Sequence, residues 1–376
     1  MVGANLDEGV VMKARRAATV AVLVLLAAAL AQPAAAASIK WLVVQLGTHG
    51  FGHLRAPSAV VTHAGPQDVG FECGKPSACQ SPEPPTEGGC GCIDVLPQGP
   101  SSFDVARDGS IWLLDIVNNR FVVWRRGQSV KPARVVAIPR NQGVGDFTLG
   151  RGGTIYLFAT PPGAGQRKLW SLTSAGRVRW QAPLTRALSN AHDAQLRIGP
   201  DGSVYTVRRE EGRGLTWTAL TTRAGRPLPV SRQRAGSAFQ PLAPGLRLLE
   251  TQPSAREIHF ALVDKANKVV RAWRVTSRTA LGEVRAAPAL VGGDLVAAVD
   301  VTQQTQGKLL WEHLILRLSP SGAVRQRFAL DARAAWDPDG TTVSTSLRVG
   351  PDGRLYQLRT DPKTGASIAR YSLGSS

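Results

Sequence analysis

Histidines and a carboxylate with metal-ligand spacing give the first chemical signal in the sequence. His49 and His53 lie four residues apart in a Gly-rich segment, with Arg55 close behind, and His192-Asp193 could supply further ligands. We interpret all five as ligand-binding candidates. Three histidines, at 49, 53 and 192, could bind Zn²⁺, with a carboxylate that accepts a hydrogen bond from a ligating ring. The alternative is that they are polar loop residues without a metal.

The first 37 residues have the three parts of a secretory signal. Basic residues at positions 13–16 precede an uncharged run that continues to Ile39, and small residues follow Pro33. This order is typical of a signal peptide, here cleaved after Ala37. A membrane anchor is the alternative, although Pro33 would break its helix. We therefore predict a secreted or periplasmic protein with no membrane span after cleavage.

All four cysteines lie in residues 47–100, a Gly- and Pro-rich segment that we predict to be a loop insert. They are Cys73, Cys79, Cys90 and Cys92. In an exported protein an even number of closely spaced cysteines favours disulfides, here two. The spacing differs from that of common structural zinc sites. Cys90 and Cys92 would each join either Cys73 or Cys79, and the sequence leaves the pairing open.

A repeat of about 45 residues organises residues 101–376. Each clear unit has an apolar alternating run, a Gly-containing turn, and a second run that opens with β-branched or aromatic residues. The turn glycines stand at positions 109, 153, 202 and 353, and two weaker units fit between the last two. Tight turns require the positive φ that glycine allows. Six units of four short strands predict an all-β, six-bladed β-propeller, with a β-sandwich as the alternative.

The last unit is one strand short. Residues 38–46 read as a strand without a unit of their own. We predict that this strand closes the last blade, since closure protects strand edges that would otherwise pair with other chains. The insert would then leave the closing blade and lie over the mouth of the central channel, where loops converge and ligands commonly bind.

One motif after the second strand of the first unit carries a family resemblance. It reads Asp115-Ile-Val-Asn118-Asn-Arg120-Phe121. This resembles the signature of the NHL repeat of extracellular and enzymatic β-propellers. The resemblance implies a propeller, and some NHL propellers are zinc-dependent lyases with channel histidines. This chain lacks histidines at matching places in several units. We expect Asp115 and Arg120 to pair across a loop as a structural contact.

Aligning the units on their turn glycines gives further channel candidates. Seven residues before the glycines stand Ser102, Asp146, Gln195 and Ser346, and Asp193 comes two residues before Gln195. The two aspartates could hold a cation such as Ca²⁺ or act as acid and base. Alternatively, each accepts backbone hydrogen bonds at a strand start. The sequence holds no Gly-x-Ser-x-Gly elbow, phosphate loop or His-Glu-x-x-His motif.

The charge balance points to the class of partner. The chain has 45 Lys and Arg against 27 Asp and Glu, a net charge of +18. Such a surface favours anionic partners, but no nucleic-acid motif occurs. We predict a monomeric binding module without a cofactor, for an anionic envelope polymer or a protein partner. The alternative is a metal-dependent lyase or hydrolase at the channel mouth, using Zn²⁺ or Ca²⁺, and a third possibility is a structural module in a larger assembly.

Overall fold

The computed structural model describes most of the chain after residue 38. The described ranges are 39–50, 58–69, 99–127, 131–139, 143–161, 163–191, 194–210, 214–233, 236–306, 308–330, 346–361 and 364–373. The predicted signal peptide and all four cysteines lie outside these ranges. Within them, no helix has both the length and the apolar character needed to cross a bilayer.

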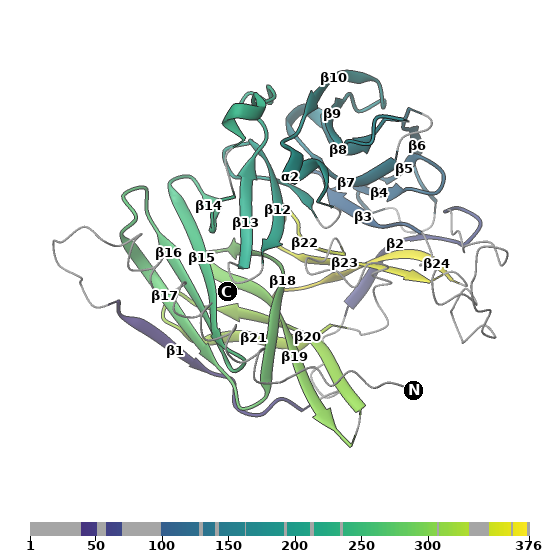
Figure 1. The fold of residues 1–376 in the computed structure, drawn as a ribbon. Helices are drawn as coiled ribbons and strands as arrows, with labels where there is room; N and C mark the ends of the chain where they lie inside the picture. The colour runs from purple at the N-terminus through teal and green to yellow at the C-terminus, as the bar shows by residue number, and fades with distance from the viewer. Residues whose placement is uncertain are drawn as a thin grey trace, which may run out of the picture.

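Six sheets follow one another along the chain as the blades of an all-β propeller, as the sequence repeat predicts (Figure 1). The strands of the first three blades are β3 (Ser102–Val105), β4 (Ile111–Asp115), β5 (Arg120–Trp124) and β6 (Arg134–Ala137); β7 (Gly143–Leu149), β8 (Ile155–Thr160), β9 (Lys168–Leu172) and β10 (Val178–Pro183); and β11 (Gln195–Ile198), β12 (Val204–Glu210) and β13 (Gly214–Ala219). A short helix, α2 (Arg186–Ser189), joins the second blade to the third.

The strands of the last three blades range in length from three to 12 residues. They are β14 (Phe239–Ala243), β15 (Leu246–Ser254), β16 (Glu257–Val263) and β17 (Val269–Thr276); β18 (Ala280–Val291), β19 (Asp294–Thr305), β20 (Lys308–Leu318) and β21 (Val324–Ala329); and β22 (Leu347–Val349), β23 (Leu355–Asp361) and β24 (Gly365–Tyr371). Apart from one added strand, neighbouring strands within a blade are antiparallel.

Turn glycines join the first two strands of the clear repeat units. Gly109, Gly202 and Gly353 have φ values of +81°, +89° and +71°. These values lie in the left-handed region, where a side chain is strained and glycine is not. Because the turn holds the first strand of each blade beside the second, the same sequence pattern places equivalent residues at equivalent positions of the first strands.

Apolar side chains fill the spaces between neighbouring blades. Phe121 of the first blade packs against Phe147 of the second, with ring centroids 4.8 Å apart. Trp273 of the fourth blade is fully buried in a cluster shared with the fifth, and its indole N–H donates to the Ser319 carbonyl at 2.9 Å. Burial of such large side chains is the main stabilising term for stacked blades.

The prediction that residues 38–46 close the last blade is wrong. The strand exists, as β1 (Trp41–Gln45), but it pairs in parallel with β17 at the edge of the fourth blade. Its Val44 is buried beside Leu46 and Trp273 in the cluster between the fourth and fifth blades. This apolar cluster explains why the strand docks there.

The outer strand of the sixth blade comes instead from inside the predicted insert. β2 (Ser58–Ala64) pairs antiparallel with β24, so this blade holds strands from both ends of the described chain. Ala64 is buried in the cluster between the sixth and first blades. The strand was missed because the Gly, Pro and Cys content of residues 47–100 outweighs one short β-branched run.

Candidate functional site

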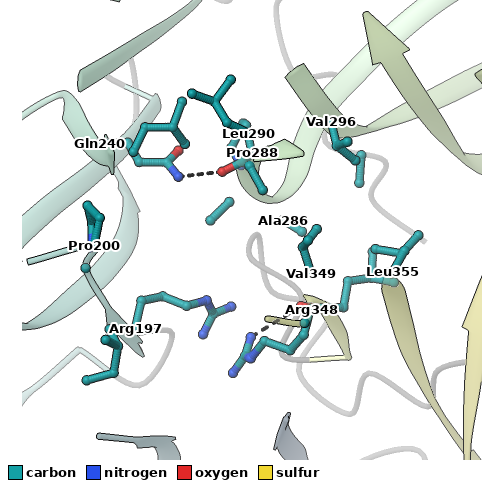
Figure 2. Close-up of a pocket in the computed structure, with 18 of the residues that line it drawn as sticks. Arg197, Pro200, Gln240, Ala286, Pro288, Leu290, Val296, Arg348, Val349 and Leu355 are labelled. Carbon is teal, nitrogen blue, oxygen red and sulfur yellow. Dashed lines mark hydrogen bonds between the residues drawn. The ribbon is translucent and has the colours of Figure 1, made fainter. Parts of the chain in front are cut away.

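A cavity of about 450 Å³ lies between the first strands of the third to sixth blades. We call it the axial cavity. Its lining comes from the first strands β11, β14, β18 and β22 and from the turns that follow β11 and β22. Residues of β13, β19, β20 and β23 complete it. In a propeller the first strands surround the central channel, where residues from several blades converge. Figure 2 shows this convergence of side chains from separate strands.

Two arginines form one end of the axial cavity. Arg197 projects from β11 and Arg348 from β22, and their guanidinium groups approach each other (Figure 2). Both residues are more than nine-tenths buried. Burial, and then the nearby charge of Arg348, lower the pKa of Arg197 to about 9. The Arg197 guanidinium therefore remains charged at neutral pH.

Asp146 supplies the counter-charge for this pair. Its Oδ2 atom accepts the Leu196 N–H at 2.7 Å and lies 3.4 Å from Nη1 of Arg197. Its Oδ1 atom accepts the Ser102 hydroxyl and lies 3.5 Å from Nη2 of Arg348. The structure thus brings together Ser102 and Asp146, two of the residues that stand seven positions before a turn glycine. The buried Asp146 carboxylate binds side chains and backbone of three other blades.

Apolar side chains form the rest of the wall. They are Leu242, Ala286, Leu290, Val296, Ile315, Leu347, Val349 and Leu355. The Gln240 side chain adds one amide, but its Nε2 donates to the Pro288 carbonyl at 2.6 Å and so is already engaged. The cavity thus combines a cationic end with an apolar body.

A second hollow, of about 370 Å³, lies between the sixth blade and the first. We call it the arginine groove, because it is lined by Arg107, Arg125, Arg126, Arg354 and Arg370. Four of the five are exposed and the last is half-buried. Their positive charges therefore reach solvent and can meet a partner directly.

The acidic side chain in this groove is already engaged. Asp352 accepts the Tyr356 hydroxyl at 2.8 Å, and burial followed by this contact raises the pKa of Tyr356 to about 12. Pro351 lines both the groove and the axial cavity, so the two hollows adjoin at the turn of the sixth blade.

Of the predicted histidine cluster, only His49 lies in the described residues. It is buried, with Nε2 2.7 Å from Oε2 of Glu312 and Nδ1 3.2 Å from Nη2 of Arg327. His53, Arg55, His192 and Asp193 fall outside the described residues, as do Cys73, Cys79, Cys90 and Cys92. Across the described ranges, no three or more His, Cys, Asp or Glu side chains gather in an arrangement that could hold a metal.

The predicted pairing in the NHL-like motif is confirmed. Nε of Arg120 and Nδ2 of Asn118 each donate to Oδ2 of the fully buried Asp115 at 2.9 Å. Nη2 of Arg120 also donates to the Asp68 carbonyl at 2.7 Å, so the motif ties the segment after β2 to the first blade. The left-handed residue of this loop is Asn119, with φ +49°.

Sequence reasoning missed the two cavity arginines, although a signal was present. Arg197 and Arg348 each stand five residues before a turn glycine, in the near-identical stretches Leu-Arg-Ile-Gly-Pro-Asp-Gly and Leu-Arg-Val-Gly-Pro-Asp-Gly. Residues two apart in a strand share a face. Positions five before a turn glycine therefore lie on the same face of the first strand as positions seven before it, where Asp146 stands. An arginine repeated on the channel face of two blades was the available clue.

Comparison with known proteins adds likenesses of fold. No protein-family model and no curated protein matches the chain. A streptogramin B lyase is 15% identical, with a TM-score of 0.37 over 72% of this chain and 78% of that one. A GH43 endo-arabinanase from Bacillus licheniformis is 13% identical, with a TM-score of 0.38 over 73% of this chain and 95% of that one.

The PQQ-bound aldose sugar dehydrogenase from Streptomyces coelicolor is a third likeness. It is 13% identical, with a TM-score of 0.37 over 82% of this chain and 99% of that one. Identities and TM-scores this low carry no argument about the ligand or the chemistry of this chain.

Proposed function

We propose that this protein is an exported, NHL-like binding module whose arginine groove holds an anionic surface polymer. The observation that carries the proposal is the groove itself, where five arginines surround one hollow. The acidic side chain in its described lining, Asp352, is shared between Tyr356 and Arg354. The signal-like N-terminus and the Asp115–Arg120 pair support export and the NHL-like character.

The chemistry of the groove favours a polymer of phosphate, sulfate or carboxylate groups over a nucleic acid. The described lining holds one aromatic side chain, Tyr356, and that ring is buried. Binding of single-stranded nucleic acid relies on exposed aromatic faces on which bases stack. Exposed guanidinium groups, by contrast, recognise any anionic oxygen and attract a polyanion from a distance.

The test compares two triple variants with equal loss of charge. The groove variant carries Arg107→Gln, Arg126→Gln and Arg354→Gln. Binding of fluorescent dextran sulfate to the full chain is measured by anisotropy, with neutral dextran as the ligand control. We expect the groove variant to bind about tenfold more weakly or worse, since three of five groove charges are gone.

The matched control removes three exposed arginines from the second and third blades: Arg177→Gln, Arg186→Gln and Arg226→Gln. We expect its affinity to stay within about twofold of that of the unaltered chain, because its changes lie away from the groove. Equal weakening in both variants would show that only net charge attracts the polymer, and the proposal would fail.

A further inference from the structure

The axial cavity contains buried charge that polymer binding at the groove does not use. Arg197 and Arg348 bring two positive charges to one end of the cavity. Within the described residues, Asp146 is the carboxylate that forms an ion pair with each of them, at 3.4 Å and 3.5 Å. Short charge-assisted hydrogen bonds measure about 2.7–2.9 Å, so these contacts are long for both guanidinium groups.

The hydrogen-bond acceptors of Asp146 are also shared with groups other than the arginines. Each of its oxygens already accepts a hydrogen bond from a neutral group, the Ser102 hydroxyl or the Leu196 N–H. Among the described residues, Nη2 of the buried Arg348 has no hydrogen-bond partner. Buried donors are normally satisfied, and an unsatisfied cationic donor at a cavity is suited to an added acceptor.

The opposite part of the cavity is unsuited to a free inorganic ion. Leu290, Val296 and Leu355 face the space beyond the guanidinium pair (Figure 2). An ion such as phosphate would satisfy the arginines but leave these walls in contact with water. A volume of about 450 Å³ falls within the range of pockets that hold small organic ligands.

We propose that the axial cavity binds a small monocarboxylic acid with an aliphatic or aromatic body. The carboxylate lies against Arg197 and Arg348, and the apolar body contacts the side chains of β18, β19 and β23. A carboxylate is a suitable complement, because Asp146 divides its two oxygens between both guanidinium groups and two neutral donors. Planar guanidinium groups match the two oxygens of a carboxylate, which gives the site its orientation. The proposal is independent of polymer binding at the groove.

The test titrates the full chain with phenylacetate and hexanoate by isothermal calorimetry. We expect saturable one-to-one binding of both acids and none of phenylacetamide, which lacks the charge. Inorganic phosphate should bind more weakly than either acid, since it has no apolar body. Phosphate binding as tight as that of the acids, or no saturable binding of any acid, would overturn the proposal.

Two single variants locate the site. Arg348→Gln should weaken phenylacetate binding by about tenfold or more, because a buried charge partner is lost. Arg354→Gln, six residues later in the arginine groove, is the matched control and should leave phenylacetate affinity unchanged. Equal effects of the two substitutions would place binding elsewhere and refute the assignment.

A third variant guards against a folding defect in Arg348→Gln. Ala286→Leu keeps both arginines and reduces the apolar end of the cavity. We expect this substitution to weaken hexanoate binding far more than acetate binding. An equal loss of affinity for both acids would contradict the apolar subsite. Dextran sulfate binding is measured in parallel. If dextran sulfate binds while no acid binds, this inference fails and the proposed function stands. If an acid binds while dextran sulfate does not, the proposed function fails and this inference stands.

Discussion

Asp146 is the residue on which the polar centre of the propeller depends. Its carboxylate receives contacts from the first, third and sixth blades, through Ser102, Arg197 and Arg348. A buried charge partner of this kind is costly to remove, because its loss leaves other buried charges uncompensated. The same residue therefore links the stability of the ring to the charge of the axial cavity.

Replacing Asp146 by Asn tests this role. The amide oxygen can still accept the Leu196 N–H, but the two guanidinium groups lose their counter-charge. We expect a loss of about 3 kcal/mol in the free energy of unfolding, measured by urea denaturation. Ser102→Ala is the control and should cost about 1 kcal/mol, since the carboxylate keeps its charge partners. Equal stability of the Asn variant and the unaltered chain would contradict this account.

A second buried carboxylate, Asp115, joins the polar side chains of the NHL-like motif. Asp115→Ala leaves Arg120 and Asn118 without their shared acceptor beneath the first blade. We expect a loss of about 3 kcal/mol in unfolding free energy. The comparison is Asp108→Ala, an exposed turn residue of the same blade, with an expected loss of about 1 kcal/mol or less. Similar losses for both substitutions would be evidence against the buried pairing.

At the scale of elements, Gly365 controls the contact between β2 and the hairpin of β23 and β24. Its φ is +93°, and an added Cβ would lie 2.0 Å from the Ala64 carbonyl oxygen. Both the backbone conformation and the close approach of β2 therefore require glycine here.

Gly365→Ala and Gly152→Ala separate strain from steric contact. Gly152 also has a positive φ, +63°, but nothing lies within 4 Å of an added Cβ. We expect Gly152→Ala to cost about 1 kcal/mol of backbone strain. Gly365→Ala should cost clearly more and lower the thermal midpoint further in a calorimetric scan, because β2 has to move. An equal drop for both would mean that the β2 contact is not tight.

β1 and β2 have different expected importance, although both are N-terminal additions to a blade. A chain that begins at residue 58 loses β1 and its single well-buried Val44, but keeps β2. We expect it to unfold cooperatively at a lower temperature. A chain that begins at residue 66 also loses β2, exposes β24, and should lose cooperative unfolding. Circular dichroism melts distinguish the two, and similar melts would show that β2 contributes nothing special.

The blades could be predicted because their signals are local. Turn glycines such as Gly109 and Gly353, with alternating apolar runs on either side, define each hairpin within a dozen residues. The partners of β1 and β2 could not, because pairing with β17 or β24 depends on side chains hundreds of residues away. Arg197 and Arg348 were visible as residues but not as a pair, since nothing in the sequence tells that β11 and β22 face one cavity.

At the scale of the whole molecule, the two proposed sites should respond differently to salt. Four of the five groove arginines are exposed, whereas Arg197 and Arg348 are buried. At 0.1 M salt the interaction between exposed charges decays over a distance of about 10 Å, whereas the interaction between buried charges is screened far less. We expect dextran sulfate binding to fall steeply as NaCl rises, while phenylacetate binding changes by less than about twofold. Parallel loss of both activities would show that the acid also binds at the exposed surface.

The sixth blade has a consequence for the order in which this chain acquires its structure. Five blades are synthesised between β2 and β24, so a nascent chain carries an unpaired apolar strand while those blades are being made. That strand is a template for association with other chains until its partner emerges. Premature termination shortly before β24 should therefore yield aggregating fragments.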